Sequence, residues 1–161
     1  RLDWITSVLH ERGGLAVWID ADTIVLDAQW QLPLDTHTFL WSLNAEEKLG
    51  DTARELLSMP ENPVYVSSVT FWEISLKTAL RKLTLENYSP DELPAIAGNI
   101  MGYQILPLEA QEAATFYQLP LIHRDPFDRM LIWQAISTKL ILVAKDSEFT
   151  AYAKYGLQTV W

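Results

Sequence analysis

Short apolar runs alternate with helical segments along residues 31–161, and this alternation constrains the fold more than any other feature of the chain. Five such runs have the length and composition of strands, at residues 31–34, 64–66, 103–106, 140–143 and 158–160. The segments between them carry apolar residues at helical spacing, which is typical of βα units with parallel strands. The sequence therefore predicts an α/β fold with a mainly parallel sheet of five strands.

Two helix starts can be predicted from capping residues. Ser89-Pro90-Asp91-Glu92 offers Ser as N-cap, Pro at the first helical position and Glu at the third, which predicts a helix that runs toward Met101. Asp125-Pro126 repeats the N-cap and proline pattern, and it predicts a helix that passes through Leu131 and Ala135. Pro33 stands in the first strand of this unit, where it removes one donor from the ladder.

Composition sets the class of protein. The chain has 161 residues, of which 49% are hydrophobic and 20% charged, so it can bury one domain with an attached segment. It contains no cysteine, which excludes disulfides and thiolate metal sites. Because no apolar run reaches the ~18 residues of a membrane span, we expect a soluble, cytoplasmic protein with no membrane association.

Aromatic and imidazole side chains give weaker indications. Trp41, Trp72 and Trp133 lie on the apolar helical pattern, so we expect them in the core rather than stacked on nucleic-acid bases. The three histidines, His10, His37 and His123, lack the spacing of zinc ligands. A zinc site is therefore not expected.

Four carboxylates stand where a parallel sheet would bring them together. Asp35 and Asp146 directly follow predicted strands, whereas Glu73 and Asp128 are expected in the first turns of helices that start at the same edge. Ligands of open α/β sheets bind at this edge, outside the carboxyl ends of the strands. Two carboxylates ~5 Å apart repel by roughly 3 kcal/mol at an effective dielectric of 20, so such a group requires a cation. All-oxygen ligation favours Mg²⁺ or Mn²⁺.

Each carboxylate also has a purely structural explanation. Asp35 and Asp146 are suitable helix or turn caps, and Asp125 is a better cap than ligand because Pro126 follows it. Glu73 is four residues from Lys77, a spacing that supports a helical ion pair of about 0.2–0.5 kcal/mol. The joint placement of the four acidic residues, rather than any one of them, indicates a metal site.

Four strings that contain these residues resemble the PIN-domain proteins of the VapC toxin type. The strings are Leu34-Asp35-Thr36-His37-Thr38-Phe39-Leu40-Trp41, Val66-Ser67-Ser68-Val69-Thr70-Phe71-Trp72-Glu73-Ile74, His123-Arg124-Asp125-Pro126-Phe127-Asp128-Arg129-Met130-Leu131-Ile132 and Leu142-Val143-Ala144-Lys145-Asp146. The resemblance implies a PIN-like three-layer α/β/α sandwich and a Mg²⁺- or Mn²⁺-dependent endoribonuclease. It also implies a small antitoxin partner, and it assigns the family's acidic quartet to Asp35, Glu73, Asp128 and Asp146.

The chemistry expected of such a protein is hydrolysis of RNA phosphodiester bonds by a metal-activated water. Asp35, Asp128 and Asp146 are the expected ligands, with Glu73 as a further ligand or as the acceptor of the water's proton. Thr36 and Ser147 follow two of these ligands and are expected to support them. The residues expected to contact RNA are Lys77, Arg81, Arg124 and Arg129, although helix-surface charges of this kind are also common without a ligand.

Net charge bears on the partners. A charge of -9 argues against binding nucleic acid by general electrostatics, but it suits a basic antitoxin whose arginine could enter the acidic cleft. The aromatic and aliphatic content is high for a chain of this size. We therefore expect a homodimer.

Residues 1–30 form an N-terminal extension of unknown role, ahead of a PIN domain at 31–161. We expect a helix at 3–11, two strands at 15–19 and 24–26, and packing of the extension's apolar residues. Val17 to Thr23, an apolar run followed by Asp-x-Asp, also offers an alternative function as a haloacid-dehalogenase-like phosphatase, although a hairpin turn explains it better. The other alternative is a catalytically silent PIN-like module that binds RNA or protein.

Overall fold

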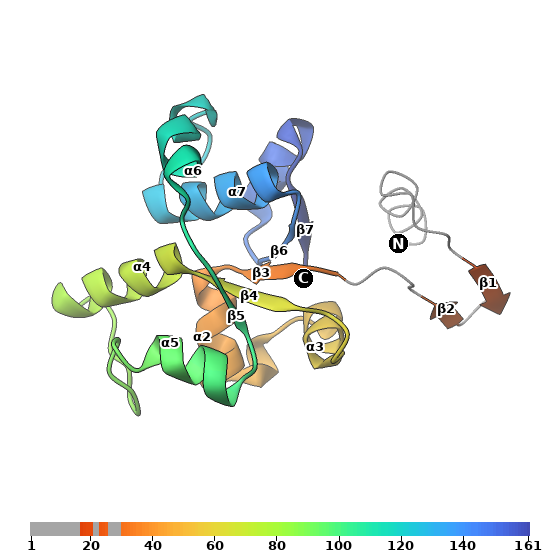
Figure 1. Ribbon diagram of the computed structural model, residues 1–161, viewed down its shortest axis with the longest axis horizontal. Coiled ribbons are helices and arrows are strands. Elements are labelled where there is room, and N and C mark those ends of the chain that lie inside the picture. Colours follow the sequence, from red (N-terminus) through yellow and green to blue (C-terminus); the bar gives the residue numbers. More distant parts are fainter. Residues whose placement is uncertain (1–16, 21–22, 26–29) are drawn as a thin grey trace.

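The computed structural model describes residues 17–20, 23–25 and 30–161, and its centre is a parallel sheet of five strands (Figure 1). The strand order is β5-β4-β3-β6-β7, and every neighbouring pair runs parallel. The strands are β3 (Leu32–Leu34), β4 (Val64–Ser67), β5 (Gln104–Leu106), β6 (Ile141–Val143) and β7 (Gln158–Val160). The predicted α/β fold is confirmed, and each predicted strand overlaps an observed one.

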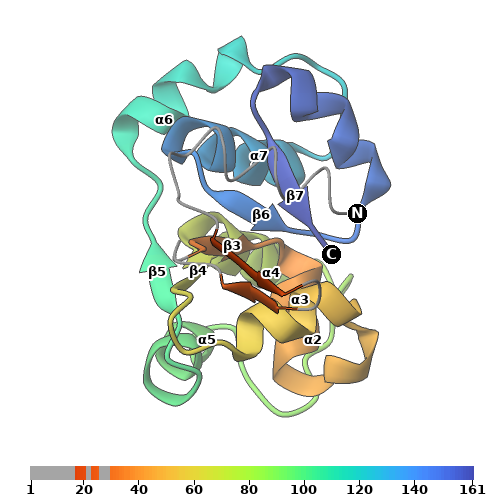
Figure 2. The same ribbon diagram turned by 90° about the vertical axis from the view of Figure 1, so that its right-hand side faces the viewer.

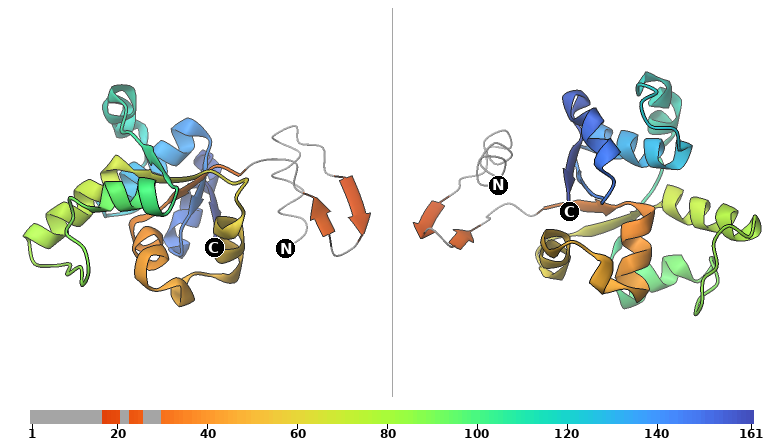
Figure 3. Two further views of the ribbon diagram at one scale, coloured as in Figure 1. Left: turned by 60° about the horizontal axis from the view of Figure 1, so that its bottom comes forward. Right: turned by 180° about the vertical axis from the view of Figure 1, so that it is seen from behind.

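Helices cover both faces of the sheet, so that the domain has three layers (Figure 2). One layer contains α2 (Thr36–Asn44), η1 (Glu46–Lys48), α3 (Asp51–Ser58), α5 (Leu93–Ala95) and η2 (Ile96–Ile100). The opposite layer contains α6 (Ala110–Thr115), η3 (Phe116–Gln118), α7 (Pro126–Thr138) and η4 (Ser147–Tyr155). Helix α4 (Ser68–Ala79) leaves the end of β4 and contacts both α2 and α7. Two further views show the same layering (Figure 3).

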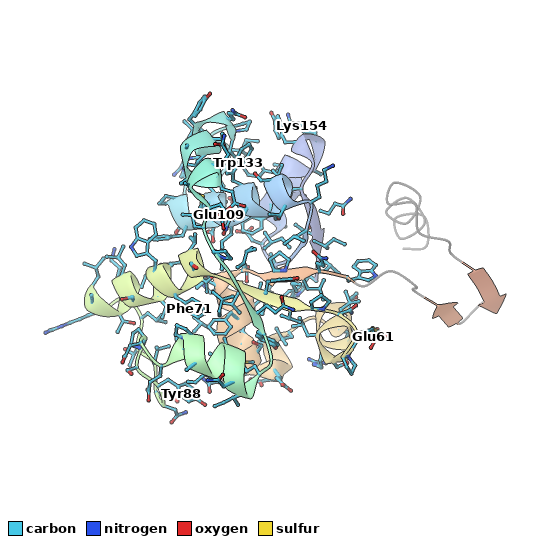
Figure 4. The ribbon with its side chains drawn as sticks, in the orientation of Figure 1. Glu61, Phe71, Tyr88, Glu109, Trp133 and Lys154 are labelled. Atoms are coloured by element: carbon cyan, nitrogen blue, oxygen red, sulfur yellow. The ribbon has the colours of Figure 1, made fainter. Side chains whose placement is uncertain are left out.

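Each face of the sheet has its own hydrophobic core. Ile141 and Val143 of β6 pack with Phe39 of α2 on one face, whereas Leu142 packs with Ile132 of α7 on the other. This division follows from the alternation of side chains along a strand. Figure 4 shows Phe71 on the side of α2 and α5, and Trp133 on the side of α6 and α7. The helix layers are thus stabilised by separate sets of buried side chains.

The central strand β3 accommodates Pro33. Leu32 donates its N–H to Pro63 O beside β4 at 3.0 Å, and Asp35 donates to Val143 O of β6 at 3.1 Å. Since N–H groups alternate between the two neighbours of a strand, the donor that Pro33 lacks faces β6. The proline costs one hydrogen bond to β6 and leaves the register with β4 intact.

Capping residues predicted one helix start correctly and one too early. Asp125 caps α7 by accepting from Phe127 N at 2.8 Å, with Pro126 at the first helical position, as predicted. Glu92 accepts from Ser89 N at 2.8 Å, but the helix begins only at Leu93 and continues as the π-helical segment η2. Pro94 explains the delay, because a residue without an N–H fits only the first turn of a helix.

Two further expectations about α4 are corrected. Glu73 lies in the second turn rather than the first, because α4 begins at Ser68. Trp72 is not part of the core: 60% of its surface is exposed, and its ring packs edge to face on Phe127 at 4.9 Å. Neighbouring positions on a helix face different directions, so Glu73 is directed inward while Trp72 is directed outward.

The extension is described only in its two short strands. β1 (Val17–Asp20) and β2 (Thr23–Val25) pair antiparallel as a sheet of their own, with Asp20 opposite Thr23. Each of the two strands predicted in the extension therefore overlaps a described strand. The helix expected at 3–11 lies outside the described residues, and the packing of residues 1–30 stays a prediction. Among the helices that the structure describes, none is long and apolar enough to span a membrane.

Gly50 provides a test of the contact between the start of α3 and the end of the chain. A Cβ added to Gly50 would lie 2.8 Å from the backbone carbon of Trp161 and 2.9 Å from its ring. Gly50→Ala should therefore lower the free energy of unfolding by about 1–3 kcal/mol in urea denaturation. Gly98→Ala is the matched control, because the nearest atom to its Cβ is 4.0 Å away. Equal stability of the two variants would contradict the contact.

Candidate functional site

Asp35 occupies the point where the central strand β3 ends and α2 begins. Its side chain caps α2 by accepting from Thr38 N at 2.6 Å, and only 4% of the residue is exposed. Burial raises the pKa of Asp35, and hydrogen bonds from Thr38 oppose that rise only in part. A buried aspartate at the carboxyl edge of the sheet is thus held by the backbone of the helix that it starts.

Glu73 of α4 is 1% exposed, and the protein provides a donor for each of its oxygens. Thr36 Oγ1 donates to Oε2 at 2.5 Å, and the ammonium of Lys77 forms an ion pair with Oε1. The threonine belongs to the first turn of α2, so Glu73 joins α4 to the segment that carries Asp35. The i, i+4 pair considered from the sequence is therefore real, but one partner is fully buried.

Lys77 is the cation that faces the buried carboxylates. Its pKa is raised: burial acts to lower it, but the hydrogen bond and charge of Glu73 outweigh burial, and the charges of Asp125 and Asp128 add to the rise. The ammonium therefore interacts with carboxylates from two helices, α4 and the start of α7.

Asp128 lies in the first turn of α7 and is largely buried. Burial, followed by the charges of Asp125 and Glu73, raises the pKa of Asp128 to about 6. The charge of Asp35 adds to this rise. Asp35, Glu73 and Asp128 therefore interact electrostatically across three helices, as expected for residues at one edge of a parallel sheet.

Asp146 follows β6 and caps η4 on a more exposed side of the site. It accepts from Glu148 N at 2.8 Å, and 39% of its side chain is exposed. Its Oδ2 lies 3.4 Å from His123 Nε2, while Nδ1 of the same ring lies 3.7 Å from Asp128 Oδ2. His123 thus stands between Asp146 and Asp128.

Sequence reasoning missed His123 and Glu148 as members of this site. Glu148 Oε2 lies 3.7 Å from His123 Nε2, and one ligand atom each from His123, Asp146 and Glu148 lie within 4.8 Å of one another. The spacing of zinc ligands along the sequence does not identify His123, because the side chains that lie near it in space are carboxylates. The available signal was local: His123 is five residues before Asp128, and Glu148 is two residues after Asp146.

The donor set fits a hard divalent cation. Carboxylate oxygens dominate, and no cysteine is present in the chain. The raised pKa values of Asp35 and Asp128 show that the buried carboxylates carry a cost when ionised, which a bound cation would remove. Asp35 and Asp128 are the buried candidates for ligands, and Asp146 lies toward solvent.

The other predicted site residues lie in different surroundings. Thr36 is buried against Glu73, whereas Ser147 is exposed at the start of η4. Arg81, just beyond α4, and Arg124 are exposed. Arg129 is buried, donates to Leu119 O at 2.9 Å and lies 4.8 Å from the centre of the Phe116 ring. The RNA contact predicted for Arg129 therefore has no support from its position.

Comparison with protein families gives one match. Residues 33–155 match the model of the PIN domain, which covers most of the chain and includes Asp35, Glu73, Asp128 and Asp146. Comparison with curated proteins gives no match.

Several solved structures share the fold. DNA-bound VapBC from Salmonella typhimurium matches with a TM-score of 0.57 and 19% identity, over 82% of this chain and 98% of that chain. FitAcB from Neisseria gonorrhoeae matches with a TM-score of 0.57 and 19% identity, over 81% of this chain and 97% of that chain. DNA-bound VapBC2 from Rickettsia felis matches with a TM-score of 0.56 and 14% identity, over 80% of this chain and 96% of that chain. At these identities the likeness establishes the architecture.

The raised pKa of Asp128 predicts a pH-dependent stability difference. Between pH 4 and 6 the unfolded chain has lost the Asp128 proton while the folded chain retains it, so rising pH destabilises the fold through this group. Asp128→Asn removes that contribution. Without divalent ions, the melting temperature of Asp128→Asn minus that of the wild type should increase from pH 4.5 to pH 7.5. A difference that stays constant or decreases would contradict the shift.

Proposed function

Because this chain belongs to the PIN domain family, we propose that it is a Mg²⁺- or Mn²⁺-dependent endoribonuclease and the toxin of a toxin–antitoxin pair. The observation that carries the proposal is the interaction of Asp35, Glu73 and Asp128 at the carboxyl edge of the sheet, with Lys77 beside them. Buried carboxylates that repel one another are unfavourable in a purely structural role, whereas they suit a cation site.

The residues divide into ligands and supports. Asp35, Asp128 and Asp146 are suited to hold the divalent ion, which when bound would activate water and offset charge on the phosphate. Glu73 accepts from Thr36 and pairs with Lys77, which favours a role in holding those two side chains over direct ligation. Hydrolysis by water needs no protein nucleophile.

Positive charge for an RNA phosphate comes from a few side chains. Lys77 keeps its proton beside Glu73, and its ammonium is available to neighbouring anions because it is only partly buried. Arg81 and Arg124 are exposed near the ends of the helices that bear Glu73 and Asp128. Local contacts of this kind would compensate for the net charge of -9.

Protein partners are supported by separate observations. The matched structures are described as VapBC and FitAB assemblies, which supports an antitoxin partner for this chain. Trp72 and Leu76 of α4 and its C-cap Leu80 form an exposed apolar stripe at i, i+4 and i+8. Exposed apolar stripes of this length favour a protein interface, and we assign this one to a second copy of the chain.

Two alternative functions remain distinguishable. A silent PIN-like module would bind RNA or protein without cleavage. A haloacid-dehalogenase-like phosphatase would require Asp20 as nucleophile, but Asp20 pairs with Thr23 in the antiparallel β1–β2 sheet, which favours a hairpin. An RNA-cleavage assay on variants of Asp35, Asp128 and Asp20 separates both from the nuclease.

Asp35→Asn and Asp128→Asn should each lower Mn²⁺-dependent cleavage of total RNA by about 100-fold or more. The melting temperature should hold or rise, because repulsion is relieved and no apolar area is lost. Asp51→Asn is the control at an exposed aspartate, and Asp20→Asn is the control for the phosphatase. Full activity in both site variants would rule out the assigned site. Loss of activity in Asp20→Asn alone would favour the phosphatase.

The chain should sediment as a dimer at micromolar concentration. Replacing Leu76 and Leu80 together with Glu should shift it to a monomer that still folds, because both side chains are exposed in the single chain. Tyr117→Glu, at another exposed aromatic residue, is the matched control and should stay dimeric. A wild-type monomer at this concentration would refute the dimer, and a dimeric double variant would exclude α4 as its interface.

A further inference from the structure

His123 is held in one orientation by contacts on several sides. Its side chain is only 10% exposed, and its ring packs edge to face on Phe149 at 5.5 Å. Its backbone N–H donates to the hydroxyl of Tyr152 at 2.8 Å, and that hydroxyl donates to Pro120 O at 3.0 Å. Tyr152 is fully buried. The loop that carries His123 is therefore fixed to the η4 layer.

The hydrogen bonds of the ring identify which nitrogen carries the proton. Asp125 donates its backbone N–H to His123 Nδ1 at 3.2 Å, so Nδ1 must present its lone pair. A neutral imidazole has a single ring proton, which therefore belongs to Nε2. Nε2 lies 3.4 Å from Asp146 Oδ2 and 3.7 Å from Glu148 Oε2. A nitrogen that bears a proton has no lone pair for a metal ion.

Asp146 needs this donor more than the buried carboxylates do. Asp35 is enclosed by its own helix, but Asp146 is partly exposed at the start of η4. Its Oδ1 accepts from Glu148 N at 2.8 Å, which leaves Oδ2 to face His123 Nε2. The carboxylate of Asp146 is thus held through Oδ1 by the η4 backbone and faces the imidazole through Oδ2.

We propose that His123 is a positioning residue: its Nε2–H orients the carboxylate of Asp146 toward Asp128 and the metal site, and the ring itself does not bind the metal. This inference rests on the proposed function. It adds His123 to the site, and Glu148 is the second carboxylate that faces Nε2. It also ties the start of α7 to the start of η4, since the ring accepts from Asp125 of the first and faces Asp146 of the second.

Two amide replacements separate a positioning donor from a ligand or a packing residue. In His123→Gln the amide N–H₂ can reach the place of Nε2, whereas in His123→Asn it reaches only the place of Nδ1. We expect Mn²⁺ affinity of the full chain, measured by titration calorimetry without RNA, to fall about 10- to 100-fold in His123→Asn. It should change by less than about threefold in His123→Gln. Equal losses in both variants, or no loss in either, would overturn the proposal.

A double-mutant cycle tests whether His123 acts on Mn²⁺ binding through Asp146. Asp146→Asn removes the carboxylate that His123 orients, so adding His123→Asn to it should weaken Mn²⁺ binding no further. Additive losses would show that His123 acts elsewhere. Melting temperatures of all variants report folding separately, and His123→Gln remains informative if His123→Asn is unstable.

Nitrogen-15 shifts of the imidazole give a readout that needs no metal. The His123 ring of the metal-free wild type should show the tautomer protonated at Nε2, identified by its absence from the His123→Gln spectrum. The opposite tautomer would overturn the inference. If Mn²⁺ affinity falls in His123→Asn but not in His123→Gln, and the wild type nevertheless does not cleave RNA, only the nuclease assignment is overturned. A wild type that does not bind Mn²⁺ would overturn both.

Discussion

The site depends on the ion pair between the buried Glu73 and the partly buried Lys77. Three carboxylates, Asp35, Glu73 and Asp128, interact in surroundings that raise the pKa of two of them, and ionised acids there repel by about 1 kcal/mol or more per pair. Lys77 supplies opposite charge beside them. Since Thr36 engages the other oxygen of Glu73, the same pair fixes α4 against α2. The contacts of Glu73 therefore both compensate charge in the site and fix the position of α4.

Much of the fold could be predicted because it depends on local patterns. Parallel strands buried on both faces are apolar runs, and those at β4 and β6 lie within a residue of the predicted ranges. Asp35 and Asp146 could be placed at one edge because strands of a parallel sheet end together. The cap at Asp125 depends on two adjacent residues, and it forms as predicted. The resemblance to the PIN family extended these patterns to a three-layer domain.

What could not be predicted depends on directions and on distant contacts. Trp72 fits an apolar helical pattern, yet the face it occupies turns outward because Glu73 and Ile74 fill the inward one. From the sequence Arg129 is expected at the surface, but its guanidinium packs on the ring of Phe116, which belongs to a separate helix. Pro94 delayed the helix expected from Ser89. His123 acquires its place from Tyr152 and Phe149, which lie some thirty residues later in the chain.

The two hydrophobic cores divide the acidic residues between them. Asp35 and Glu73 begin or belong to helices whose apolar residues, such as Phe39 and Ile74, pack in one core. Asp128 belongs to α7 and Asp146 caps η4, and the residues Ile132 and Phe149 of these helices pack in the other core. The distance between these two carboxylate pairs therefore depends on how each helix layer packs on the sheet. Substitutions in either core, far from any carboxylate, are expected to change the spacing of the site.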